Sequence, residues 1–113
     1  MPSDCVFCKI VQNEISSKKV FEDTEIIAFH DIAPKAPVHV LVLPKQHVVS
    51  LNDADEAMLG KLLTRVKLLA RELGLAERGY KVINNCGKEG GQIVQHLHFH
   101  LLGGAPLQGK GLV

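Results

Sequence analysis

The stretch His96-Leu97-His98-Phe99-His100 places three histidines at every second position of an otherwise apolar run. Successive side chains of a β-strand point to opposite faces, so this spacing predicts a strand with three imidazoles on one face. Leu97 and Phe99 would then lie on the other face. Three of the six histidines of the chain fall within these five residues, and histidine is not a residue that strands prefer. The pattern therefore indicates a functional site rather than an exposed strand edge.

A row of imidazoles fits either catalysis or metal binding. Same-face positions of a strand lie roughly 6.5 to 7 Å apart, so three in a row converge poorly on one ion, and catalysis is favoured over an all-histidine metal site. Neutral imidazole is a good nucleophile toward phosphorus near pH 7, and its phosphoryl adduct turns over readily. His98 has an imidazole on each side, which makes it the best-placed nucleophile.

Around this stretch the sequence predicts an α+β domain with a mostly antiparallel sheet of about five strands, one long helix and one short N-terminal helix. Strands are expected at residues 20–22, 25–31, 38–43, 80–85 and 95–102. The short helix is expected over 5–11 with Asp4 as its N-cap. The long helix is expected over 54–73, capped by Asn52 or Asp53 and ended by Gly74. Its apolar stripe, which includes Leu63, should cover the sheet.

Length and composition limit the other possibilities. The 113 residues are expected to form one domain over 1–113, with no predicted order in the tail over 105–113. The net charge is +1 and the charges are scattered, so neither a nucleic-acid nor a membrane partner is expected. No apolar run reaches the roughly 20 residues that span a bilayer, and the N-terminus lacks the features of a signal peptide. A cytoplasmic protein without a disulfide framework is expected.

Further candidates lie outside the histidine stretch. His39 lies inside the expected strand 38–43, where a lone histidine is usually a core residue, although antiparallel pairing would bring it beside the other imidazoles. Cys5 and Cys8 have the spacing of half a zinc site, and chance or redox alternatives stay open on spacing alone. His47 follows a proline turn and by itself indicates only surface. Cys86 has no evident partner.

The residues from Gly90 to Gly104 resemble the signature of the histidine triad superfamily, His-x-His-x-His followed by two apolar residues. Other segments resemble the branch of histidine triad nucleotide-binding proteins: residues 28–32, 34–37, 38–40, 44–47 and 90–92. The resemblance implies a homodimer with a continuous sheet across its interface. It also implies hydrolysis of purine nucleoside phosphoramidates, such as adenosine 5′-phosphoramidate or lysyl-AMP, with no cofactor required for catalysis.

The resemblance further implies roles for single residues. His98 would form a nucleotidyl-histidine intermediate, His100 would contact the α-phosphate and shuttle the proton, and His39 would complete the relay. His96 would orient His98 through its backbone carbonyl. The other nucleotide-binding residues that it implies are Phe29, His30, Asp31, Ile32, Asn85, Gln92 and Ile93. In this scheme Asp31 takes the ribose hydroxyls, Asn85 and Gln92 hold phosphate oxygens, and Phe29, His30 and Ile32 line the pocket.

Two departures from the family pattern concern the leaving group. Ile93 stands where some members have a serine that touches the phosphate, so only its backbone N–H can serve there. The tail also lacks the tryptophan that some relatives carry near the C-terminus.

Many bacterial-type members bind zinc, and the residues that match their ligands here are Cys5, Cys8, His47 and His96. Four protein ligands would make a closed, structural site that pins the N-terminal helix against the histidine strand.

Two other functions compete with phosphoramidate hydrolysis. One is hydrolysis of dinucleoside polyphosphates, as in the fragile-histidine-triad branch of the superfamily. The loop Gly90-Gly91-Gln92 and the ending Gly103-Gly104 resemble the phosphoramidase branch more closely. The other is a nucleotide-binding regulatory module that works through partner interactions rather than turnover. Substitution of His98 separates the enzyme from the module.

Overall fold

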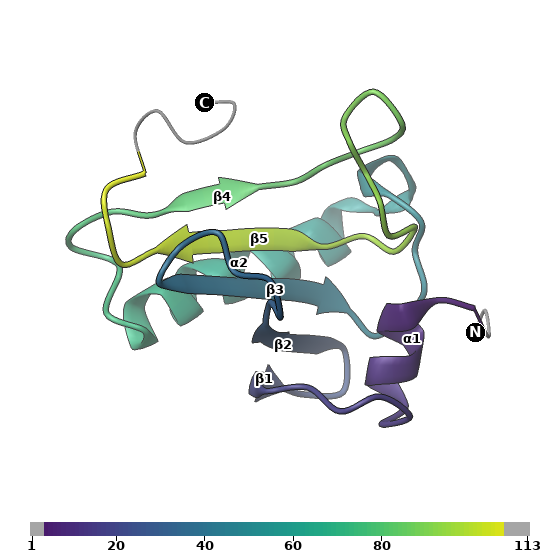
Figure 1. Ribbon diagram of the computed structural model, residues 1–113. Coiled ribbons are helices and arrows are strands. Elements are labelled where there is room, and N and C mark those ends of the chain that lie inside the picture. The colour runs from purple at the N-terminus through teal and green to yellow at the C-terminus, as the bar shows by residue number, and fades with distance from the viewer. Residues whose placement is uncertain (1–3, 108–113) are drawn as a thin grey trace.

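The computed structural model describes residues 4–107, and one antiparallel sheet of five strands is its centre (Figure 1). The strands are β1 (Lys19–Glu22), β2 (Ile26–His30), β3 (Val38–Pro44), β4 (Lys81–Ile83) and β5 (Phe99–Gly103). They lie in the order β1-β2-β3-β5-β4. Two α-helices, α1 (Val6–Val11) and α2 (Glu56–Glu72), and a short 3-10 turn, η1 (Leu51–Asp53), complete the fold. The α+β prediction is confirmed; residues 108–113 of the expected tail lie outside the described residues.

The sheet separates two apolar layers. On one face α2 covers the strands (Figure 1). Its buried side chains belong to one core cluster with Leu97, Phe99 and Leu101. On the opposite face the short helix α1 packs beside the end of β3, where Phe7 forms a second cluster with Phe29. Burial of both clusters away from water supplies the main driving force for this arrangement.

The expected histidine strand is right in its alternation and wrong in its bounds. β5 begins at Phe99, opposite Val42, rather than at residue 95, although β3 itself continues to Pro44. The preceding residues are held otherwise: the N–H of Leu97 donates to the carbonyl of Val48 at 2.7 Å. Leu97 and Phe99 nevertheless belong to the layer under α2, whereas the rings of His96 and His98 contact Phe7 in the other layer.

Each α-helix has a different N-cap residue from the one that the sequence predicted. Asp55 caps α2, since its Oδ1 accepts from the N–H of Met58 at 2.9 Å, and the expected caps Asn52 and Asp53 instead lie in η1. Cys5, not Asp4, caps α1. Gly74 ends α2 as predicted, with a φ of +78° that favours glycine. Leu63 of the expected core stripe is 46% exposed.

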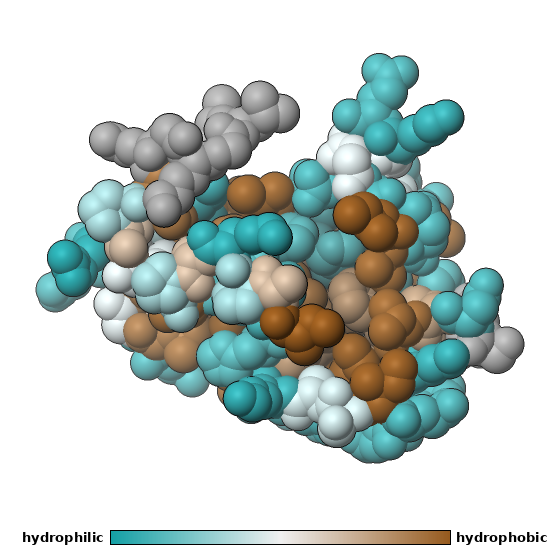
Figure 2. All heavy atoms as spheres, viewed as in Figure 1, coloured by the Kyte–Doolittle hydropathy of each residue, from teal (hydrophilic) through white to brown (hydrophobic). Residues whose placement is uncertain are grey.

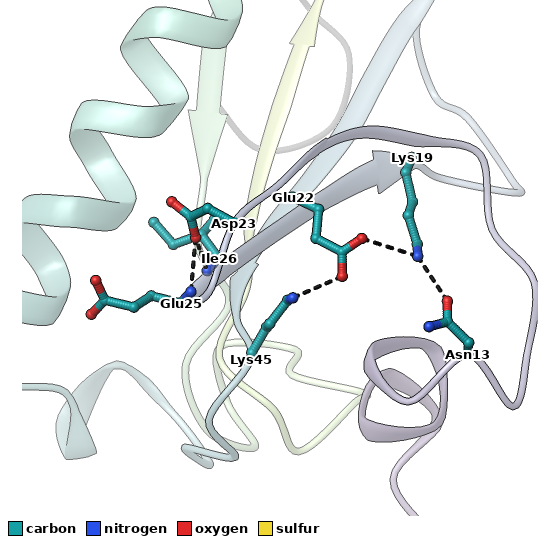
Figure 3. Close-up of polar contacts among 7 residues, drawn as sticks. All are labelled: Asn13, Lys19, Glu22, Asp23, Glu25, Ile26 and Lys45. Atoms are coloured by element: carbon teal, nitrogen blue, oxygen red, sulfur yellow. Dashed lines mark hydrogen bonds and ion pairs between the residues drawn. The ribbon is translucent and has the colours of Figure 1, made fainter.

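Polar contacts close the β1–β2 hairpin (Figure 3). Oδ1 of Asp23 accepts from the backbone N–H of Ile26 at 2.7 Å, which fixes the turn. The carboxylate of Glu22 pairs with Lys45 at 2.7 Å and with Lys19 at 3.1 Å. Lys45 directly follows β3, so these contacts tie the edge strand to the centre of the sheet. Within residues 4–107, the helices are too short or too polar to cross a membrane.

Candidate active site and metal-binding cluster

A pocket of about 420 Å³ opens on the face of the sheet that carries α1. Eight of the residues that the sequence indicated for the nucleotide line it: Phe29, His30, Asp31, Ile32, Asn85, Ile93, His98 and His100. They come from β2 and the loop after it, from the segment after β4, and from β5 and the residues before it. Figure 2 shows hydrophobic residues gathered on this face next to α1. The fold therefore brings segments that are far apart in sequence to one pocket.

Residues that the sequence did not single out complete the apolar wall of the pocket. Val6, Phe7 and Ile10 come from α1, and Leu41 comes from β3. The apolar side of the helix over 5–11 is visible in the sequence. Nothing in its spacing, however, indicates that it packs beside the imidazoles, because that contact depends on the tertiary fold.

Gln92 was also expected to bind the nucleotide, but it does not line this pocket. Its Oε1 accepts from the N–H of Gly87 at 2.9 Å, and its Nε2 donates to the carbonyls of Val49 at 2.6 Å and Val94 at 3.1 Å. The side chain is buried and is not part of the pocket wall. It therefore holds the loop in place, while Asn85 from the same loop does reach the pocket.

His98 has a defined protonation geometry. Its Nδ1 lies 2.7 Å from the backbone carbonyl of His96, and a carbonyl only accepts, so Nδ1 carries the ring proton and Nε2 keeps the lone pair. The Nδ2 of Asn84 donates to the carbonyl of His98 at 2.9 Å, and the ring of Phe7 packs against the imidazole edge-on at 5.0 Å. Burial lowers the pKa of His98 below its usual 6.5. A neutral, oriented imidazole results, as a nucleophile requires.

His39 and His100 form a second imidazole pair beside His98. Pairing of β3 with β5 brings Nε2 of His39 to 2.9 Å from Nδ1 of His100, as antiparallel pairing predicted. A carboxylate oxygen of Asp31 lies 3.5 Å from the same Nε2. Burial lowers the pKa of His39, and burial together with the neighbouring imidazoles lowers that of His100 to about 4. Both rings are therefore neutral near pH 7.

Two cysteines, one at the N-cap of α1 and one within it, meet two histidines, one from the loop after β3 and one from the residues before β5. One sulfur or nitrogen from each of Cys5, Cys8, His47 and His96 lies within 4.8 Å of the other three. Sγ of Cys5 is 3.4 Å from Nδ1 of His96, and Sγ of Cys8 is 3.2 Å from Nδ1 of His47. Neighbouring ligands of a tetrahedral zinc ion lie about 3.3 to 3.8 Å apart, from the usual Zn–S and Zn–N bond lengths. The cluster therefore has the dimensions of a metal site.

The protonation of this cluster also suits a cation. The Nε2 of His96 lies 2.8 Å from the carbonyl of Pro44 and must donate to it, so the lone pair of Nδ1 faces the thiols. Burial and the neighbouring Cys5 raise the pKa of the Cys8 thiol to about 11. The backbone N–H of Cys8 points at Sγ of Cys5 at 3.3 Å. A bound cation would therefore relieve the cost of placing thiolates at this depth.

Comparison with known proteins identifies the family. The HIT domain model matches residues 12–107. An uncharacterized HIT-like protein from Synechococcus elongatus is 49% identical over 95% of this chain and 96% of its own length. The purine nucleoside phosphoramidase of Escherichia coli is 42% identical over 95% of this chain and 92% of its own length.

Solved structures agree with the sequence relatives. A HIT family hydrolase from Legionella pneumophila superimposes with a TM-score of 0.90 at 45% identity, over 95% of this chain and 98% of that one. A HIT family hydrolase from Clostridium thermocellum gives a TM-score of 0.92 at 43% identity, over 99% and 100% of the two chains. The likeness thus covers the sheet, both helices and the imidazole-lined pocket.

Proposed function

This chain belongs to the HIT domain family, and we propose that, as a hydrolase of that family, it cleaves the P–N bond of purine nucleoside phosphoramidates. The observation that carries the proposal is the geometry of His98: its Nδ1 proton is bound by the His96 carbonyl and its Nε2 lone pair is left for attack, in a ring that lines the pocket. The relative from Escherichia coli that is named a purine nucleoside phosphoramidase supports the choice of substrate class.

The reaction proceeds in two displacements at phosphorus. In the first, Nε2 of His98 bonds to phosphorus, the P–N bond of the substrate breaks, and the amine departs with the electron pair and a proton. The positive charge on the nucleotidyl-imidazole faces the carbonyl of His96 through the Nδ1–H. In the second, water attacks phosphorus, the bond to His98 breaks, and the nucleoside monophosphate is released with a neutral imidazole restored.

The pocket divides between the two ends of a nucleotide. The apolar wall of α1 and β2, with Phe7 and Phe29, suits a purine ring. Asp31 lines the same pocket, and its carboxylate suits the ribose hydroxyls, although its Oδ1 already accepts from the N–H of Ala33. Asn85 and His100 also line the pocket and would hold the phosphate, although the Nδ2 of Asn85 already donates to the carbonyl of Gly90. The amide of Gln92 is engaged elsewhere, so it supports the phosphate only through the loop.

We further propose that the Cys5, Cys8, His47 and His96 cluster holds a structural zinc ion. All four ligands come from protein, which leaves no open position for substrate, so the ion would contribute stability rather than chemistry. His96 belongs to both sites: its ring faces the cysteines, and its carbonyl binds the His98 ring. The ion would thereby anchor the residue that orients the nucleophile.

A single-turnover reaction tests the proposed function. Wild type and His98→Ala are mixed with adenosine 5′-phosphoramidate, quenched in base and analysed by intact-protein mass. We expect an added AMP mass on wild type and none on His98→Ala, with turnover reduced about a thousandfold or more. The variant His100→Asn serves as the matched control, because it should form the adduct on the same residue at a lower rate.

Two other outcomes would replace the proposal. Cleavage of a dinucleoside polyphosphate without cleavage of the phosphoramidate would assign the alternative hydrolase activity. Binding of AMP by wild type and His98→Ala alike, with neither substrate cleaved, would assign a nucleotide-binding module.

A further inference from the structure

Exposed apolar side chains gather at the pocket that His98 lines. Among residues 4–107, four of the eight large apolar side chains that are exposed line this pocket: Val6, Ile15, Ile32 and Ile93. Apolar groups that gather in this way are typical of a binding surface. We propose that Ile93 binds the substituent of the departing amine, so that phosphoramidates of alkyl amines are the preferred substrates. The inference rests on the proposed function, because it names the leaving group of that reaction.

The first step is that Ile93 has fixed neighbours but an open side chain. Gln92 is buried, and its amide donates to the carbonyls of Val49 at 2.6 Å and Val94 at 3.1 Å. Val94 packs against the apolar cluster that contains Phe7. The side chain of Ile93 itself is 90% exposed. A ligand that covers a side chain on a fixed backbone loses little affinity to ordering, so Ile93 is a prepared apolar contact.

The second step is the direction in which the amine leaves. In a displacement at phosphorus the attacking and leaving atoms lie roughly in line, on opposite sides of the phosphorus atom. The attacking ring, His98, is buried against Phe7. The amine substituent therefore points away from that buried ring, toward the open side of the pocket. Ile93 lines the same pocket and is open to solvent there.

The third step is a second cavity that adjoins the first. It has a volume of about 330 Å³, and it shares three lining residues with the imidazole pocket: Val6, Ile93 and Val94. These three apolar side chains form a ridge between the two cavities. An alkyl chain on the departing amine can lie over this ridge and reach the second cavity while the nucleoside occupies the first. The site thus has room for an amine with several carbons.

The fourth step is the choice between an apolar and a cationic substituent. Asp4 also lines the second cavity, and its carboxylate attracts cations. Asp4 is exposed, however, and a single ion pair in water contributes little binding. Burial of each methylene group raises affinity about two- to fourfold. Several methylenes on the ridge therefore outweigh one exposed charge, which favours alkyl amines as the leaving group.

Two substrates that differ only in the amine test the role of Ile93. The N-methyl and N-hexyl derivatives of adenosine 5′-phosphoramidate release amines of nearly equal basicity, so the breaking of the P–N bond is matched. We expect kcat/KM of wild type to be about tenfold higher for the hexyl substrate. In Ile93→Ser the ratio of the two values should fall to about threefold or less. Leu63→Ser is the matched control, because Leu63 is exposed on α2, across the sheet, and its variant should keep the wild-type ratio.

Several results would overturn the inference. A structural effect of Ile93→Ser would slow both substrates alike and leave their ratio unchanged. If the same variant also sedimented differently from wild type, Ile93 would be assigned to contact with a second copy of the chain. Faster cleavage of a 1,5-diaminopentane derivative than of the hexyl substrate would assign the selection to Asp4. Equal cleavage of the methyl and hexyl substrates by wild type would refute the inference and leave the proposed function intact, whereas cleavage of neither would refute both.

Discussion

At the scale of single residues, backbone groups decide where three imidazoles carry their protons. An N–H faces Nδ1 of His39, a carbonyl faces Nε2 of His96, and another carbonyl faces Nδ1 of His98. Each ring consequently presents a different group: a donor N–H to His100, a lone pair to the cysteines, and a lone pair to the pocket. Three residues of one type thus acquire three kinds of chemistry from their position on the backbone.

The lowered pKa of His100 predicts how stability depends on pH. Burial and the neighbouring imidazoles bring its pKa to about 4 in the folded protein, whereas 6.5 is usual for an exposed histidine. Between these values the unfolded chain binds more protons than the folded one, so the free energy of unfolding falls as the pH is lowered from about 6.5 to about 4. Above pH 6.5 the contribution of His100 is fully present, and we expect no further change from it.

Urea unfolding followed by circular dichroism at several pH values checks this dependence. His100→Gln is the control, because glutamine is polar and does not titrate. The unfolding midpoint of the variant should fall less steeply than that of wild type between pH 6.5 and pH 4. Parallel curves for the two proteins would contradict the lowered pKa.

At the scale of helices and strands, periodic features were predictable from sequence and tertiary contacts were not. Alternation over 96–100 gives the correct faces, and the run over 38–43 correctly places His39 on a neighbouring strand. The start of β5 was wrong, because the residue Leu97 before it bonds to the carbonyl of Val48, a tertiary contact that spacing does not indicate. Gln92 was expected to hold phosphate, but its amide instead holds a loop by donating to the carbonyl of Val49. Val49 is far from Gln92 in the sequence, so residue spacing does not indicate this contact.

The helix α1 yields a prediction at this scale. It has six residues, too few for a stable isolated helix, it precedes the residues that match the HIT domain model, and it supplies Phe7 to the pocket. If zinc links it to the sheet, purified protein should carry about one zinc per chain. Cys5→Ser should lose the metal and lower the Tm by about 10 °C or more, since about 1 kcal/mol corresponds to about 4 °C or more in a small domain.

Cys86→Ser is the matched control for this experiment. Cys86 is the third cysteine and is not one of the four clustered residues, so this variant should keep the metal content and the Tm of wild type. AMP should also bind more weakly to Cys5→Ser, because the apolar wall of the pocket moves with α1. Protein with well under one zinc per chain, together with an unchanged Tm for Cys5→Ser, would refute the structural zinc.

At the scale of the whole molecule, the sheet has two edges that differ in character. β1 is interrupted by a register shift and carries Lys19 and Glu22, which pair with each other. Charges and irregular pairing are typical of an edge that does not join another sheet. β4 is regular, and its Val82 is 40% exposed. The edge of β4 is therefore the better candidate for the continuous sheet of the homodimer that the family resemblance implies.

This difference predicts the oligomeric state and the residue that controls it. We expect wild type to sediment as a dimer and Val82→Lys as a monomer, because a symmetric interface brings the substituted positions of both copies together, where two lysines would repel. Val49→Lys is the control: Val49 is 43% exposed and lies outside the strands, so its variant should remain dimeric. Sedimentation velocity distinguishes these masses. A dimeric Val82→Lys would exclude pairing through β4, and a monomeric wild type would exclude the dimer itself, in which case the pocket and the imidazoles of one chain must suffice for activity.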